Sequence, residues 1–243
     1  DTALMVLNAQ YGVEVGTINQ FRYTEQFHKP VIFVVNQLDN DKADYEGTIA
    51  QLKDRWGSKI VPIQYPISCG SSFNAVVDVL KMKMYRWKPE GGVPDVLEIP
   101  AEEMDKAMEL HQALVEAAAE NDDTLMEKFF DDPSTITEEE ILRALRAGTL
   151  KMDIVPMFCG SSFKNKGVQT LLDYVCAFLP SPLDTPAIVG TNPSTGAEED
   201  RKPSEDEKTS ALAFKIATDP YVGRLTFFRV YSGKVEAGSY IYN

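Results

Sequence analysis

The chain has 243 residues, of which 44% are hydrophobic and 25% charged, a composition that is typical of globular proteins and argues against global disorder. No stretch approaches the roughly 18 consecutive apolar residues of a membrane span, and the first residues lack the basic flank of a signal peptide, so we expect a soluble cytoplasmic protein. Three cysteines without metal spacing and only two histidines argue against a disulfide framework, a zinc site and Ser-His-Asp or Cys-His catalysis.

The net charge of −13 is concentrated in one segment. Residues 98–146 carry 15 Asp or Glu and 4 Lys or Arg, a balance of −11, which leaves −2 for the rest of the chain. Such an acidic block is either a solvated helical surface or a docking surface for a basic protein, and it is unsuited to nucleic-acid phosphates. We therefore expect no direct sequence-specific reading of nucleic acid by this chain.

The first quarter of the chain predicts alternating strands and helices. Apolar runs at residues 3–7 and 31–35 predict buried strands on either side of a helix over 17–28. A second helix is expected near 44–56, and a third strand over 59–64. This β-α-β-α-β order predicts an α/β fold with a right-handed, parallel sheet.

Polar residues follow the second predicted strand directly. Asn36, Gln37 and Asp39 stand at its carboxyl end, where open parallel sheets bind ligands. A carboxylate can accept two N–H donors at once, and guanine offers such a pair on N1 and N2 whereas adenine does not. Asn36 and Asp39 are thus candidate guanine-binding residues; a loop-capping pair is the alternative.

The regular alternation then breaks. After residues 73–80 and a Gly-Pro turn at 88–92, apolar spacing from Met104 to Ala117 predicts a helix. A second helix is expected to begin after Thr137, whose hydroxyl can cap it, and to stop at Gly148. A strand at 154–158 and a helix over 167–178 resume the sheet, so residues 68 to about 150 look like an insertion into one α/β domain.

The last part of the chain has a different pattern. Residues 179–186 and 190–210 are rich in Pro, Ser, Thr and charge, which predicts a linker. Beyond it, alternation at 211–217, 224–231 and 239–242 predicts antiparallel strands of a β-barrel. Since too few strands follow to close a barrel, and the chain starts without Met at a strand, we expect a piece of a longer protein.

One pentapeptide occurs twice. Cys69–Phe73 and Cys159–Phe163 both read Cys-Gly-Ser-Ser-Phe, and both follow an apolar segment. A Gly-Ser loop after a strand can direct backbone N–H groups to the O6 atom of guanine. By distance along the chain the first copy is the more attractive partner of Asn36, but spacing alone leaves the choice between the two copies open.

Three longer stretches carry a resemblance to a known family. Residues 159–169, 179–184 and 210–233 closely resemble bacterial translation elongation factor G, a translational GTPase. The resemblance divides the chain into the C-terminal half of the G domain (1–67), an α+β insert (68–153), the final G-domain strand and helix (154–186), a linker (187–209) and the start of a barrel domain (210–243). It implies that Gly160, Ser161 and Ser162 form the base-contacting loop, and that the identical earlier copy with Ser71 and Ser72 is a coincidence.

The resemblance also implies partners and cofactors. The intact protein would bind GTP or GDP, with Mg²⁺ held by residues outside this chain, and would promote movement of transfer and messenger RNA on the ribosome. In this family the insert approaches the ribosomal stalk proteins, and Glu109, Glu116 and Glu120 fall on one helical face that could meet lysines there.

Two departures from the family pattern stand out. The sequence has no Gly-x-x-x-x-Gly-Lys-Ser/Thr phosphate loop and no switch turn, so this chain alone should not hydrolyse GTP. Gln37 replaces the lysine of the family's Asn-Lys-x-Asp motif, and either covers the base with its methylenes or weakens nucleotide binding. A ribosome-binding factor with little or no GTP hydrolysis, or a release, recycling or ribosome-protection relative, is therefore the alternative reading.

Overall fold

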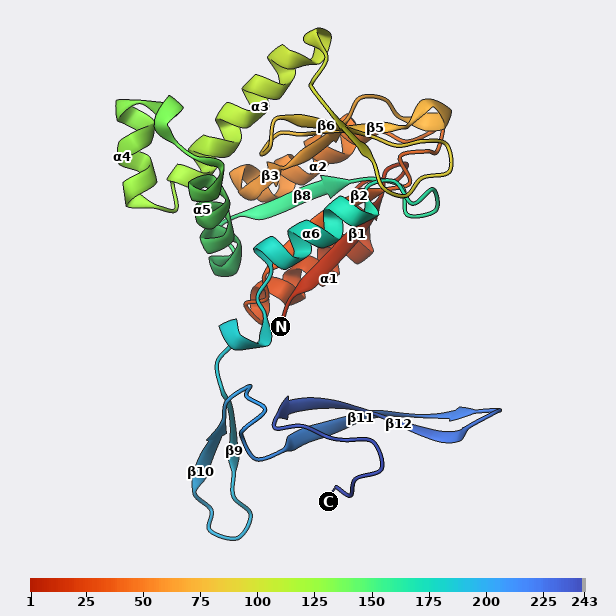
Figure 1. Ribbon diagram of the computed structural model, residues 1–243, viewed down its shortest axis with the longest axis vertical. Helices are drawn as coiled ribbons and strands as arrows, with labels where there is room; N and C mark the ends of the chain where they lie inside the picture. The colour runs from red at the N-terminus through yellow and green to blue at the C-terminus, as the bar shows by residue number, and fades with distance from the viewer. Residues whose placement is uncertain (242–243) are drawn as a thin grey trace. The chain divides into compact units, whose positions relative to one another are not determined.

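The computed structural model describes residues 1–241 and divides into two compact units, Asp1–Pro180 (unit 1) and the residues from Ser181 on (unit 2). Unit 1 contains two sheets and all the α-helices of the described chain, and unit 2 contains β-hairpins (Figure 1). No helix within residues 1–241 is long and apolar enough to cross a membrane.

A four-stranded parallel sheet forms the centre of unit 1. Its strands are β1 (Ala3–Asn8), β2 (Val31–Asn36), β8 (Val155–Cys159) and β3 (Ile60–Pro62), side by side in that order. The predicted parallel sheet is present, but β8, from late in the chain, lies between β2 and β3. β2 is buried over Val31–Val35, as its unbroken apolar sequence requires of a strand that is covered on both faces.

Helices cover both faces of this sheet. On one face, Phe33 of β2 stacks with Phe21 of α1 (Val15–Gln26), and both rings contact Trp56 of α2 (Tyr45–Trp56). On the other face, Phe158 of β8 packs on Tyr174 of α6 (Val168–Phe178). Successive side chains of a strand point to opposite faces of the sheet, so β8 can pack against the helices on both faces (Figure 1).

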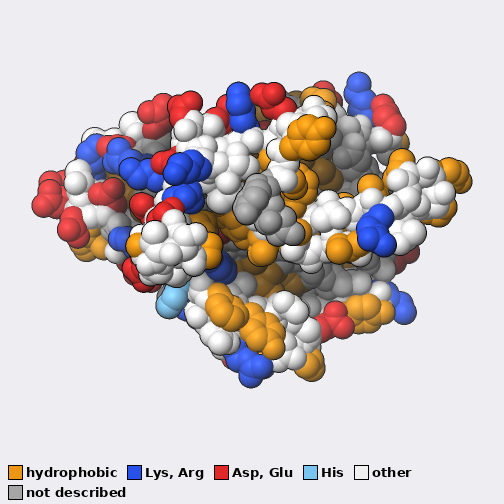
Figure 2. Space-filling model, turned by 90° about the horizontal axis from the view of Figure 1, so that it is seen from below, with side chains coloured by type: hydrophobic (Ala, Val, Ile, Leu, Met, Phe, Trp, Pro, Cys, Tyr) orange, Lys and Arg blue, Asp and Glu red, His pale blue; other side chains and the backbone are white. Residues whose placement is uncertain are grey.

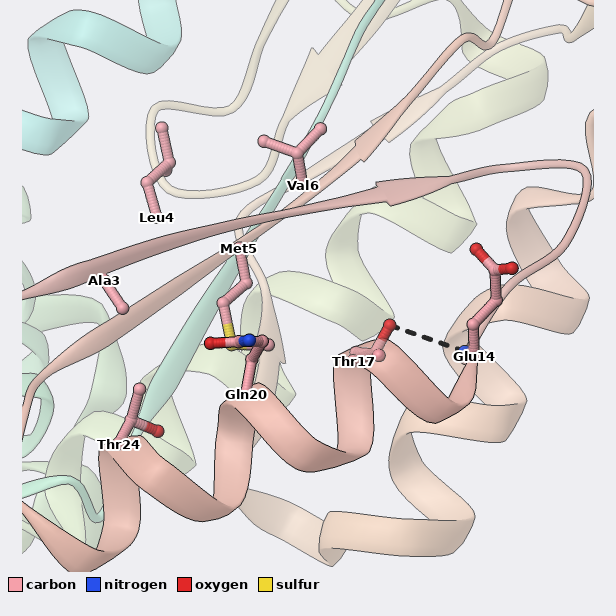
Figure 3. Close-up of a pocket in the computed structure, with 9 residues that line it drawn as sticks. Ala3, Leu4, Met5, Val6, Glu14, Thr17, Gln20 and Thr24 are labelled. Atoms are coloured by element: carbon pink, nitrogen blue, oxygen red, sulfur yellow. Dashed lines mark hydrogen bonds between the residues drawn. The ribbon is translucent and has the colours of Figure 1, made fainter.

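Strand β1 is an edge of the parallel sheet within the described residues. Leu4 and Val6 are 44% and 58% exposed, whereas Met5 points toward α1, and a hollow beside them is lined by both elements (Figure 3). Helix α1 begins at Val15, two residues before the predicted start, because Glu14 caps it, its N–H donating to Thr17 Oγ1. It also ends two residues before the predicted end, at Gln26.

The insert, together with strand β4 (Gln64–Pro66) just before its predicted start at residue 68, has its own antiparallel sheet and three helices. The sheet orders β4, β5 (Ala75–Asp78), β6 (Lys83–Arg86) and β7 (Asp95–Leu97), and the helices are α3 (Ala101–Ala119), α4 (Asp123–Asp131) and α5 (Glu138–Lys151). The predicted third strand over 59–64 is too long, because Gln64 already belongs to β4 of this second sheet. Residues 1–241 also contain four single turns of 3-10 helix: Gly57–Lys59, Gly70–Ser72, Pro133–Thr135 and Pro182–Asp184.

Gly148 does not stop its helix, contrary to the prediction. α5 continues to Lys151 and ends at Met152, which has a left-handed φ of 68°. A Cβ on Gly148 would lie 2.7 Å from Ile154 Cδ1, so the glycine allows the helix to approach the start of β8 closely. The glycine thus serves packing rather than chain reversal.

The described part of unit 2, residues 181–241, contains two antiparallel hairpins. The predicted linker contains β9 (Ile188–Thr191) and β10 (Glu198–Arg201), so it is not structureless. β11 (Ser210–Asp219) and β12 (Gly223–Ser232) agree with the predicted strands, whereas residues 239–241 form no strand and Tyr242 lies outside the described residues. Apolar side chains of the second hairpin are exposed, among them Leu212, Phe214 and Ile216, and Figure 2 shows apolar side chains at the surface of the face it draws.

Candidate functional site

The carboxyl ends of β2 and β8 bring two loops together. Val35 pairs with Cys159 in the sheet, so the residues that follow each strand emerge side by side. Leu38 N–H donates to Gly160 O at 3.2 Å and Gly160 N–H donates to Val35 O at 3.0 Å. The loop of Asn36–Asp39 is therefore joined to the loop that begins at Gly160.

Side chains of the two loops are hydrogen-bonded to one another. Ser161 Oγ donates to Asp39 Oδ1 at 2.6 Å. Asn36 Oδ1 accepts from Ser162 N–H at 2.9 Å and from Ser162 Oγ at 3.1 Å. Ser161 is buried, at 1% exposure, whereas Ser162 is exposed and Asp39 half-buried. The four predicted polar side chains thus form one constellation, although the two loops lie more than 120 residues apart in sequence.

Sheet order decides between the two pentapeptides. The later copy follows β8, the neighbour of β2, and of the two copies it is the one that is hydrogen-bonded to Asn36 and Asp39 within the described residues. The earlier copy lies close by but contacts other atoms: Ser71 N–H donates to Asp41 Oδ1 at 3.0 Å. Distance along the chain therefore favours the copy that does not contact Asn36, since a strand from late in the sequence is inserted into the middle of the sheet.

Backbone N–H groups of the later loop are largely used within the protein. Gly160 N–H donates to Val35 O, and Ser161 N–H to Lys166 O, so neither is available for a base in this arrangement. Ser162 N–H is held by the Asn36 carboxamide, a side chain that can change partner. Gly160 instead has a steric role, because a Cβ there would lie 2.6 Å from Lys166 O.

Gln37 is exposed and has a left-handed φ of 64°. Its Oε1 accepts from Asn8 Nδ2 at 2.9 Å, and Asn8 Oδ1 in turn accepts from Gln10 N–H at 2.9 Å. The carboxamide is thus tied to the end of β1 by one hydrogen bond between neutral groups. This contact was not predicted from the sequence, because only the parallel pairing of Asn8 with Asn36 places β1 beside the loop.

One exposed aromatic side chain next to the site in the chain was not predicted as a candidate from the sequence. Phe163 directly follows Ser162, is 87% exposed, and has Lys164 Nζ 5.3 Å from its ring centroid. An exposed aromatic ring offers a face on which a base can stack. The available signal in the sequence was the aromatic residue at the end of the pentapeptide.

The thiols next to the site are unsuited to nucleophilic chemistry. Burial raises the pKa of Cys159 and of Cys69 above the usual thiol value, so both are protonated at neutral pH. Within residues 1–241, no group of three or more His, Cys, Asp or Glu side chains could hold a metal ion. What the site does offer are the hydrogen-bonding groups of Asn36, Asp39, Ser161 and Ser162.

The carboxylate of Asp39 and the amide of Asn36 are the groups predicted to contact a guanine base, and known proteins with a similar sequence bind GTP. A model of the elongation factor Tu GTP binding domain matches residues 1–181. The chain belongs to this family of GTP-binding domains. Its matched region covers unit 1 and therefore includes both loops of the candidate site.

Two curated relatives match the whole chain. Elongation factor G of Amoebophilus asiaticus is 45% identical and that of Cytophaga hutchinsonii is 47% identical, each over 245 aligned residues covering 100% of this chain and 35% of the relative. A crystal structure of a protein from Thermus thermophilus is similar with a TM-score of 0.78 and 26% identity, over 98% of this chain and 33% of that one. The chain thus spans about a third of the length of the relatives it matches.

The family resemblance stated from the sequence is thereby confirmed. The chain combines part of a GTPase-type α/β domain, with an α-rich insert, and the first strands of an antiparallel β domain. The roles of the individual residues at the candidate site stay predictions.

Proposed function

We propose that this chain supplies the guanine-recognising part of an elongation-factor-G-like translational GTPase. The observation that carries the proposal is the hydrogen-bonded constellation of Asn36 and Asp39 with Ser161 and Ser162 at the ends of adjacent parallel strands. One oxygen of Asp39 is held by Ser161, which orients the carboxylate toward the N1 and N2 donors of guanine. Ser162 N–H can turn from Asn36 to the O6 acceptor of the base.

The intact protein would combine this base site with a phosphate site. The phosphates and Mg²⁺ supply the strongest charged contacts in such sites, and this chain has no phosphate-loop motif to make them. Asn36, Asp39, Ser161 and Ser162 therefore determine which base is bound, while hydrolysis depends on other parts of the protein. Promotion of ribosomal translocation is the function proposed for the whole.

Gln37 motivates a second candidate, a ribosome-binding factor with little or no GTP hydrolysis. A lysine at this position would carry a charge to the nucleotide side of the loop, whereas Gln37 makes one neutral hydrogen bond to Asn8. A release, recycling or ribosome-protection relative would share the same domains.

Ribosome-stimulated GTP hydrolysis by the intact protein and its Gln37→Lys variant discriminates between these functions. For a translocase we expect turnover in both proteins, with nucleotide affinity increased severalfold at most in the variant, because one exposed charged contact is worth about 1 kcal/mol or less. If the wild type instead binds the ribosome without hydrolysing GTP, and Gln37→Lys restores hydrolysis, the second candidate is supported. Asp54→Asn, an exposed change on α2, controls for the same change of +1 in net charge.

A further inference from the structure

The earlier pentapeptide, Cys69–Phe73, is hydrogen-bonded to both loops of the candidate base site. Gly70 N–H donates to Leu38 O at 2.8 Å, in the loop that carries Asp39. Phe73 O accepts from Lys166 Nζ at 2.9 Å, in the loop that carries Ser161. The two copies of the pentapeptide therefore belong to one network of hydrogen bonds. The later copy is part of the candidate base site, and the earlier copy supports it.

Lys166 connects the two copies of the pentapeptide. It is only 8% exposed, and among the described residues no carboxylate lies within ion-pair distance of its Nζ. A buried amine needs hydrogen-bond acceptors, and here the acceptor is the backbone of the insert. The backbone of Lys166 pairs with Ser161 through two hydrogen bonds, 2.9 Å from Ser161 N to Lys166 O and 3.0 Å from Lys166 N to Ser161 O.

The contact between the earlier copy and the loop that carries Asp39 depends on Gly70 and Asp41. Gly70 has a φ of +80°, a conformation that favours glycine, and a Cβ there would lie 3.1 Å from Asp41 Oδ1. Asp41, two residues beyond Asp39 in the base loop, accepts from Ser71 N–H through its Oδ1. The turn Gly70–Ser72 is thus held against the segment that follows Asp39.

We propose that Lys166 and the turn Gly70–Ser72 are positioning elements that hold Ser161 and Asp39 in the geometry for guanine. This inference rests on the proposed guanine-binding function and adds a role for the first pentapeptide. The chain of contacts runs from Phe73 through the Lys166 side chain to its backbone, then to Ser161, and from the Ser161 hydroxyl to Asp39. Loosening it lets Ser161 leave Asp39, which weakens selection of the base.

The test compares Lys166→Met, which keeps the stem and removes the amine, with the wild type and with Lys151→Met at the exposed end of α5. In the intact protein we expect Lys166→Met to reduce the preference for GDP over ADP about tenfold, since a hydrogen bond to a charged group contributes that much or more. Amide hydrogen exchange at Ser161 and Lys166, measured without nucleotide, should accelerate about tenfold. Lys151→Met should change neither quantity.

A milder variant, Asp41→Ala, keeps the inference falsifiable if Lys166→Met unfolds the protein. Asp41 is exposed, and its loss removes only the acceptor for Ser71 N–H, so we expect faster exchange at Ser71 and a severalfold smaller preference for GDP over ADP. Unchanged exchange and unchanged base preference in a folded variant would overturn the inference. A wild-type protein without preference for GDP over ADP would refute the guanine-binding function, while the exchange rates would still decide whether Lys166 and the turn hold the loop.

Discussion

Asp39 determines the base specificity in the proposed site. Guanine presents an N2 amine to this carboxylate, whereas xanthine presents an O2 acceptor at the same position. We expect Asp39→Asn to lower GDP affinity by on the order of 100-fold or more and to increase affinity for xanthosine diphosphate, because the amide supplies a donor where the carboxylate had only acceptors. Competition between GDP and xanthosine diphosphate for binding to the intact protein measures this change in base preference.

Asp54→Asn, an exposed change on α2 that removes one carboxylate in the same way, is the matched control for this change. If Asp39→Asn weakens both nucleotides equally, the carboxylate supports the loop without contacting the base, and the loop-capping interpretation holds.

Asp78 joins the insert to the helix that follows the base loop. Its Oδ2 accepts from Tyr174 Oη of α6 at 2.7 Å, and its Oδ1 accepts from Lys81 N–H at 3.0 Å. Burial raises the pKa of Asp78, and the hydrogen bonds from Lys81 N–H and Tyr174 lower it in part. A raised folded-state pKa means that stability falls as the pH rises from the unfolded value of about 3.9 through the folded value.

Tyr174→Phe should therefore destabilise unit 1 more at pH 7 than at pH 4. Removing the hydroxyl leaves a buried carboxylate with fewer donors, at a cost of about 1–3 kcal/mol at neutral pH, and raises the pKa of Asp78 further. Both tryptophans, Trp56 and Trp87, lie in unit 1, so urea unfolding followed by tryptophan fluorescence reports on this unit. Tyr11→Phe removes an exposed hydroxyl as the control, and an equal loss at both pH values would show that Asp78 is not involved.

At the scale of elements, the start of α5 depends on Glu140. Its Oε2 accepts from Thr137 N–H at 3.0 Å, which completes a capping box, and its Oε1 pairs with Lys128 of α4. The hydrogen bonds from Lys128 and from Thr137 lower the pKa of Glu140 to about 2. Glu140 thus stabilises the fold above the unfolded pKa, and this contribution is lost as the pH falls toward 2.

We expect Glu140→Gln to lower the urea midpoint of unit 1 at pH 6 and to reduce the loss of stability between pH 6 and pH 3. The exposed Glu139→Gln, one residue earlier on the same turn, should behave like the wild type. A variant whose midpoint depends on pH as steeply as that of the wild type would contradict the role assigned to Glu140.

At the scale of the whole molecule, the acidic face of α3 bears on the proposed ribosomal partner. Glu109, Glu116 and Glu120 are exposed, and the last two line a hollow of about 370 Å³ together with apolar side chains of α3 and β3. Charge complementarity mainly raises association rates and weakens with salt. An acidic rim beside apolar side chains is complementary to a basic amphipathic protein surface.

Reversal of these three charges to lysine should lower ribosome-stimulated GTP hydrolysis by the intact protein, with the larger deficit at low salt. The control carries Glu198, Glu205 and Asp206 of unit 2 as lysines, which matches the change in net charge. Ribosome stimulation that is unchanged in the α3 variant would show that this acidic face is only a solvated surface.

Local sequence patterns predicted much of the fold. Period and turn residues located β1, β2, α2, α3, β8 and α6 to within a few residues. The errors lie where a residue acts through tertiary contact: Gly148 packs against Ile154 instead of ending α5, and Gln64 pairs with Asp78 instead of extending β3. The expected linker contains a short hairpin that its polar composition did not predict, because polar residues can form strand pairs as well as apolar ones.

The sequence by itself determined the α/β class of the first unit, the acidic insert, the family and the candidate residues Asn36 and Asp39, because these depend on residue type and local order. Only the tertiary structure decided which Cys-Gly-Ser-Ser-Phe copy meets those residues, and that the other copy contacts it through Lys166. The physical reason is strand order: β8 enters the sheet beside β2 after the whole insert, and no local pattern in the chain encodes that pairing.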